Sequence, residues 1–101
     1  MKKICFLGDI YTATAFRLAG VEITVTRPEQ SARDLALLLK KADAAVILVT
    51  TPIAASLQSE IYETNLNRTY PVILEVPEIK DIRDRQTSLI EYITEALGMS
   101  L

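Results

Sequence analysis

Short apolar runs alternate with longer segments of mixed polarity along the chain, and each run has the length of a β-strand. The runs lie at residues 4–7, 21–25, 44–49 and 72–76. Three of them are almost continuously apolar, which is typical of strands buried on both faces of a sheet. The segments between them have the composition and spacing of helices, and they comprise residues 10–18, 31–41 and 53–66. This alternation predicts an α/β fold with a small, doubly wound, four-stranded parallel sheet of the Rossmann-like or receiver-like kind.

Residues that begin and end helices stand close to these segments. Asp9 can cap the first helix, and Gly20 lies just past its end. The stretch 28–31 offers a turn and caps before the second helix, and Thr51-Pro52 does the same for the third. The local chemistry therefore agrees with the hydrophobic pattern on where the helices begin.

The pattern changes after the fourth apolar run. Residues 77–83 have the composition of a loop, and residues 84–97 are predicted to form a last helix that Gly98 ends. We therefore expect one domain, in which residues 1–76 form the parallel-sheet core and residues 77–101 form a loop and a C-terminal helix packed on it.

Charge and composition exclude several classes of protein. The net charge is −2, so no excess of positive charge points to DNA, RNA or anionic lipid as a partner. The chain has no histidine and one cysteine, which excludes an internal disulfide, a zinc site, a histidine base and a Ser-His-Asp triad. Its apolar stretches are too short for an export signal or for the roughly 18 residues that span a bilayer. We expect a cytoplasmic protein without membrane insertion.

The corner after the first strand is where open α/β sheets usually bind ligands, so Gly8, Asp9, Thr12 and Thr14 are the first candidates. A dinucleotide fingerprint needs three closely spaced glycines, and a P-loop ends in Gly-Lys-Ser/Thr. The chain has only three glycines, scattered along its length, and neither motif is present. The corner is therefore interpreted as a tight turn and a helix cap, and no catalytic, cofactor or metal site is predicted.

Two signalling classes share this architecture but lack their reactive groups here. A phosphoreceiver needs an aspartate at the end of the third strand, where this chain has Thr50-Thr51. A phosphocysteine carrier needs its thiol in the loop after the first strand, but Cys5 lies within the strand and is predicted to be buried. Glu60 and Glu63 are interpreted as part of a solvated helix face. A receiver-like or phosphocarrier-like module stays the alternative function, and a free-standing ligand-binding domain is a second one.

Three blocks of sequence resemble a known family in the right order. They are Gly8-Asp9 with Thr12 and the stretch 16–21, the stretch 45–50 with Ile53-Ala54, and the stretch 70–77 with its two bounding prolines. Together they resemble the F subunit of the prokaryotic V-type/A-type ATPase over nearly the entire chain. The chain departs from the pattern at Ile10, where many relatives carry an acid, and at Ala15, where many carry glycine. Neither change threatens the fold.

The resemblance implies a noncatalytic rotor part of a rotary, cation-transporting ATPase. The F subunit of that family binds the long coiled coil of the D subunit in a one-to-one heterodimer, and together they form the central stalk. It meets the A/B catalytic hexamer and the membrane rotor-linking subunit only indirectly. The family thereby couples ATP hydrolysis or synthesis to H⁺ or Na⁺ transport, as part of a peripheral complex on the cytoplasmic face of the cell membrane.

Structural and partner-binding roles are assigned to separate residues. The structural motif comprises Gly8, Asp9, Phe16, Arg17, Gly20, Pro71 and Pro77. Phe16, Leu18 and Ile73 are predicted to lie in the core, and Arg17 is predicted to pair with a carboxylate inside the domain. Apolar residues outside the core are what an interface uses. The partner surface is predicted at Ile79, Ile82, Arg83, Tyr92 and Ile93, and the alternative is an ordinary fourth helix that covers the sheet.

Overall fold

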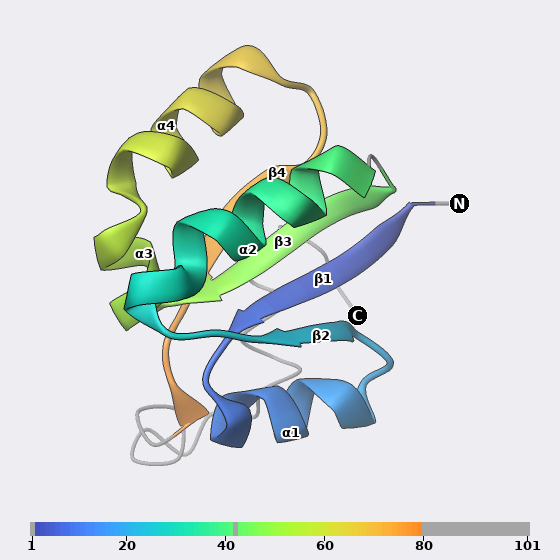
Figure 1. Cartoon of the computed structure of the whole chain (residues 1–101). Helices are drawn as coiled ribbons and strands as arrows, with labels where there is room; N and C mark the ends of the chain where they lie inside the picture. The colour runs from blue at the N-terminus through green and yellow to red at the C-terminus, as the bar shows by residue number, and fades with distance from the viewer. Residues whose placement is uncertain (1, 42, 80–101) are drawn as a thin grey trace.

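The computed structural model describes residues 2–41 and 43–79. Their elements follow the order β1 (Lys3–Gly8), α1 (Ile10–Leu18), β2 (Glu22–Val25), α2 (Pro28–Lys41), β3 (Ala44–Thr50), α3 (Thr51–Ser56), α4 (Gln58–Asn67) and β4 (Val72–Val76). The strands form one four-stranded sheet in the order β2-β1-β3-β4, and every pair is parallel (Figure 1). The predicted α/β fold is confirmed, and the predicted last helix lies outside the described residues.

The sheet separates two apolar layers. On one side, α2, α3 and α4 cover the strands, and Leu35 of α2 and Ile53 of α3 pack with Cys5 and Ile47 of the central strands. On the other side lies α1, whose Phe16 packs with residues of β1, β3 and β4. The alternation of side chains along each central strand supplies both layers, which explains why β1 and β3 are nearly continuously apolar.

The ends of α1 follow the predicted chemistry. Asp9 is the N-cap, and its Oδ2 accepts a hydrogen bond of 3.0 Å from the backbone N–H of Thr12. Gly20 follows the helix with a φ of 82°, a conformation that glycine adopts without the steric cost of a Cβ atom. The predicted bounds of this helix, its cap and its terminating glycine are therefore confirmed.

The second helix begins earlier than the hydrophobic pattern indicated. It starts at Pro28, because proline fits the first turn of a helix, where its missing N–H removes no hydrogen bond. Ser31 is consequently inside the helix, buried, and its hydroxyl donates to the Pro28 carbonyl at 2.8 Å. The prediction that the stretch 28–31 precedes the helix is wrong.

The predicted third helix, residues 53–66, is two helices in the structure. Leu57 separates α3 from α4 with φ −118° and ψ 21°, and its side chain is fully buried. The break keeps Leu57 in the core while the two helices take different directions (Figure 1). Thr51 and Pro52 are the first residues of α3 rather than its cap, because the helix begins as soon as β3 ends. No glycine or proline marks the break at Leu57.

Candidate functional site

The carboxyl ends of β1 and β3 form the place where a ligand would be expected in this topology. The chain runs from β1 through α1 to β2 on one side, and from β3 through α3 and α4 to β4 on the other. The strand order therefore reverses between β1 and β3, and ligands of open α/β sheets bind at such a switch point. Gly8 ends β1, and Thr50 ends β3.

The protein itself fills the space around Gly8. A Cβ atom on Gly8 would lie 2.7 Å from Cγ2 of Thr50 and 2.8 Å from the ring of Phe6. Both neighbours are buried, and the Phe6 ring stacks on Phe16 with a centroid distance of 4.8 Å. Glycine is needed here because two buried side chains occupy the position of its missing Cβ. The close packing explains why a small residue is needed where β1 ends.

The polar side chains near Gly8 also form contacts within the domain. One carboxylate oxygen of Asp9 caps α1, and the other is buried with no hydrogen-bond partner among the described residues. Thr12 is fully buried, and its Oγ1 accepts a 3.1 Å hydrogen bond from the backbone N–H of Ile79. Thr51 donates to the carbonyl of Val76 at 3.5 Å, which ties the end of β3 to the end of β4. These contacts hold the start of the C-terminal segment beside α1 (Figure 1).

The candidate reactive groups do not form a site within the described part of the chain. Cys5 is buried in β1, and burial is the main cause that raises the pKa of its thiol, with the charges of Glu22 and Asp43 adding to it. A raised pKa reduces the thiolate fraction and therefore the reactivity. Glu60 and Glu63 are exposed on α4, as predicted. Residues 2–41 and 43–79 contain no cluster of three or more metal-ligating side chains.

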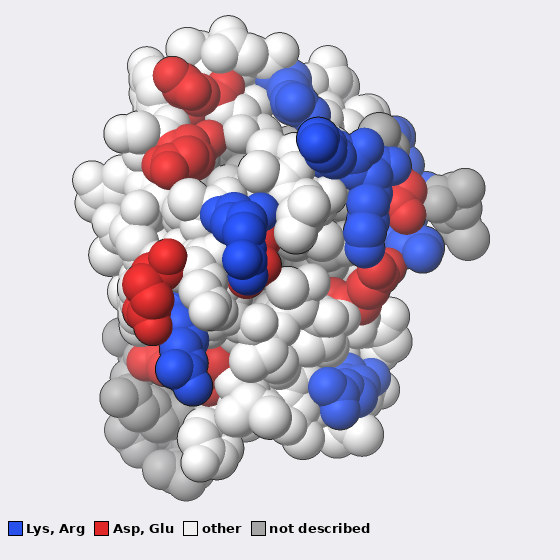
Figure 2. Space-filling model, in the orientation of Figure 1, with Lys and Arg blue, Asp and Glu red and all other residues white. Residues whose placement is uncertain are grey.

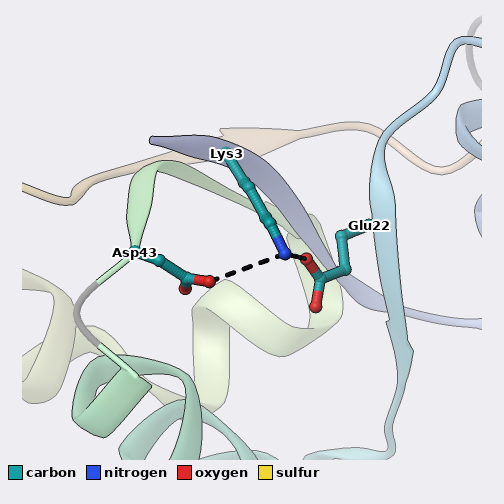
Figure 3. Close-up of polar contacts among 3 residues, drawn as sticks. All are labelled: Lys3, Glu22 and Asp43. Carbon is teal, nitrogen blue, oxygen red and sulfur yellow. Dashed lines mark ion pairs between the residues drawn. The ribbon is translucent and has the colours of Figure 1, made fainter. Parts of the chain in front are cut away.

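A cluster of charged side chains lies at the opposite end of the sheet, where the strands begin. Lys3 of β1 lies 3.3 Å from a carboxylate oxygen of Glu22, the first residue of β2, and 3.6 Å from one of Asp43, just before β3 (Figure 3). Glu22, followed by Asp43, raises the pKa of Lys3. On the face that carries α2, basic side chains gather toward this end (Figure 2). All three side chains are solvent-exposed, so the cluster adds little stability.

The structure assigns different environments to the other predicted residues. Phe16 and Ile73 lie in the core as predicted, with 0% and 2% exposure. The prediction for Leu18 is wrong: its side chain is 88% exposed, because the core-facing side of α1 is formed by Thr12, Ala13 and Phe16. Arg17 is exposed and forms no ion pair with a described residue.

The remaining predicted positions concern β4 and the segment after it. Pro71, which follows a cis peptide bond, and Pro77 bound β4 as expected. Ile79 is half-buried, with its backbone bonded to Thr12. The other four residues of the predicted partner surface, Ile82, Arg83, Tyr92 and Ile93, lie outside the described residues.

One surface was missed in the sequence. Ile10, Tyr11 and Leu18 are exposed on α1 by 56%, 78% and 88%. The signal was available, since the helix carries a single charged residue, Arg17, and so has no strongly polar face.

No helix in the described ranges is long and apolar enough to cross a membrane.

The chain is similar to known proteins over almost its full length. The model of the family described as ATP synthase (F/14-kDa) subunit matches residues 4–93. The F subunit of the A-type ATP synthase of Thermococcus kodakarensis is 33% identical, with 98% of this chain and 97% of the relative covered. The protein of the same name in Methanothermobacter thermautotrophicus is 30% identical, with 98% and 95% covered. The F subunit of the V-type ATP synthase of Fusobacterium nucleatum is 26% identical, with 100% and 96% covered.

Proposed function

Because the chain belongs to the family of ATP synthase (F/14-kDa) subunits, we propose that it is the noncatalytic central-stalk subunit of a V-type/A-type ATPase. In this role it binds the coiled-coil D subunit one-to-one and helps to couple ATP hydrolysis or synthesis in the A/B head to rotation and to H⁺ or Na⁺ transport. It works in the peripheral complex on the cytoplasmic face of the membrane. The observation that carries the proposal is the match over almost the whole length of chain and relatives.

The geometry of the sheet supports a structural role. Buried side chains occupy the space at the switch point, and a carboxylate oxygen of Asp9 caps α1. The residues there stabilise the connection between the two halves of the fold. A subunit that transmits torque needs a stiff body, and a close-packed interior provides it, because it has low compressibility and transmits strain.

The C-terminal segment is proposed as part of the surface that meets the D subunit. The proposed set is Ile79, Ile82, Arg83, Tyr92 and Ile93. Ile79 supports the placement, since its backbone N–H is bonded to Thr12 and the segment therefore starts against α1. Apolar and arginine side chains are enriched in the centres of interfaces. Tyr92→Asp is expected to weaken the complex, and an unchanged complex with a folded variant would remove Tyr92 from the surface.

The test of the function is the assembly state of the chain with its shaft partner. The chain is mixed with the coiled-coil shaft protein encoded in the same organism and analysed by size-exclusion chromatography with light scattering. A single species with the mass of a one-to-one complex is expected. Two separate peaks at micromolar concentration would overturn the proposal, because a permanent shaft must stay assembled at that concentration.

A further inference from the structure

The helix α1 has apolar side chains on both of its sides. Thr12, Ala13 and Phe16 face the sheet and are completely buried. Tyr11 and Leu18, exposed by 78% and 88%, project from the opposite side of the helix. With 3.6 residues per turn, positions 11, 14, 15 and 18 form one stripe about 100° wide that points away from the core. A helix that is apolar on both sides is normally buried on both sides.

The helix α2 shows what a solvent-facing side looks like in this protein. It exposes Glu29, Arg33, Lys40 and Lys41 along its length. The outer stripe of α1 has no charge, and Arg17 beside it is the only charged residue of the helix. Because both helices cover the same sheet, the difference is not a general property of the fold. The outer stripe of α1 therefore differs from that of α2, which carries charges along its length.

The shape of the stripe suits another helix. Tyr11 and Leu18 are two turns apart, so they form two ridges, and the smaller Thr14 and Ala15 lie between them. Small side chains between two large ones leave room for a ridge of side chains from a second helix. The hydroxyl of Thr14 already donates to the carbonyl of Ile10 at 2.9 Å, so its proton needs no acceptor from a partner.

The area and charge of the surface also fit a partner protein. If each of the large exposed side chains Ile10, Tyr11 and Leu18 presents on the order of 100–150 Å², together they supply about half of the roughly 800 Å² that one partner buries in a stable interface. Arg17 forms no ion pair with a described residue, so its guanidinium is available to a carboxylate from outside. The partner surface that fits this face of α1 is therefore an apolar stripe with an acidic residue at its border.

We propose that the outer face of α1 docks one helix of the coiled-coil shaft protein. The face comprises Ile10, Tyr11, Thr14, Ala15 and Leu18, with Arg17 at its border. The docked helix packs an apolar stripe against these side chains and places a carboxylate next to the Arg17 guanidinium, as coiled coils do with the charges that flank their core. The identity of the partner rests on the proposed function. Ile79 bonds to Thr12 on the buried, sheet-facing side of the same helix, so the C-terminal segment begins beside α1.

The test compares two matched pairs of substitutions in the full chain. The first is Tyr11→Ser with Leu18→Ser on α1. The control is Tyr62→Ser with Leu66→Ser on α4, which removes the same side-chain types at 68% and 67% exposure from a helix on the other face of the sheet. Binding to the purified shaft protein is measured by titration calorimetry, and folding by circular dichroism and thermal unfolding. We expect the α1 pair to raise Kd at least tenfold and the α4 pair to change it less than threefold.

A charge reversal gives a second, independent readout. Arg17→Glu is expected to weaken binding and to reduce its dependence on salt, whereas Arg33→Glu on α2 is expected to leave both unchanged. If the unsubstituted chain does not bind the shaft protein, the proposed function fails. If it binds and the α1 pair binds equally well, only the present inference fails. The inference is also overturned if the α1 pair unfolds the protein or if the pair abolishes self-association instead, since the face would then be covered by this chain or by a second copy.

Discussion

The close approach of β1 to β3 at Gly8 leads to a specific prediction for Gly8→Ala. Ordinary contacts of a Cβ atom lie at 3.4–4 Å, but here they would be 2.7 Å to Thr50 and 2.8 Å to Phe6. Neither neighbour can move into open space, because Thr50 is 1% exposed and Phe6 is completely buried. The backbone is also held, since the Gly8 carbonyl accepts a 2.9 Å hydrogen bond from the N–H of Thr26.

The expected cost of Gly8→Ala follows from this overlap. Inserting a methyl group into a well-packed core costs about 1–3 kcal/mol in the free energy of unfolding. For a domain of this size, each kcal/mol lowers Tm by about 4–8 °C. Thr50→Ser removes one of the three crowding atoms, Cγ2, and leaves the Phe6 ring and Oγ1 of residue 50, which lies at 3.0 Å, so the double variant is expected to recover part of the loss. Urea unfolding followed by circular dichroism measures all four proteins of the double-mutant cycle.

Gly20→Ala is the control that separates crowding from backbone strain. Gly20 has a φ of 82°, and no atom lies within 4 Å of a Cβ placed there. Its substitution is expected to cost about 1 kcal/mol through backbone conformation alone and to be unaffected by Thr50→Ser. A Gly8→Ala variant with the wild-type unfolding midpoint, or one whose loss Thr50→Ser does not reduce, would refute the reasoning about close packing at the switch point.

Three further measurements test other parts of the structure. The side chain of Asn65 accepts a hydrogen bond from the N–H of Ile73 at 2.8 Å and donates one to its carbonyl at 3.0 Å, on the edge strand β4. Asn65→Ala should therefore lower the free energy of unfolding by about 1–2 kcal/mol and increase self-association in light scattering, and a monomer of unchanged stability would contradict this. Cys5 should react with a thiol reagent much more slowly in the native protein than in urea, because its thiol is buried and its pKa is raised; equal rates would contradict the burial. The pKa of Lys3 is raised, so its stabilising contribution should be complete at neutral pH and lost as the pH rises above the ordinary pKa of a lysine; Lys3→Met should remove this step from the pH dependence of unfolding.

The sequence predicted helix bounds and strands correctly wherever a local residue pattern allows one structural interpretation. Asp9 and Gly20 carry capping and left-handed backbone chemistry that few other residues share, and the bounds of α1 follow from them. The apolar runs predicted all four strands, because buried parallel strands need apolar side chains on both faces. The break at Leu57 was not predictable in this way, since a leucine there fits a continuous helix equally well, and only the packing of its side chain into the core selects the break.

The same reasoning explains why Leu18 was misplaced and why the candidate docking face was missed. An apolar side chain on a helix is equally satisfied in its own core or against a partner, and the sequence of α1 offers both sides of the helix to apolar surroundings. The sheet accepts only one of them, and the stacking of Phe16 on Phe6 decides which one. Leu18, two positions further along the helix, must then point away from the sheet. Its side chain is 88% exposed and does not contribute to the described core. A helix with apolar residues on both sides therefore indicates two contact surfaces. The structure is needed to tell which of them packs on the sheet and which faces outward.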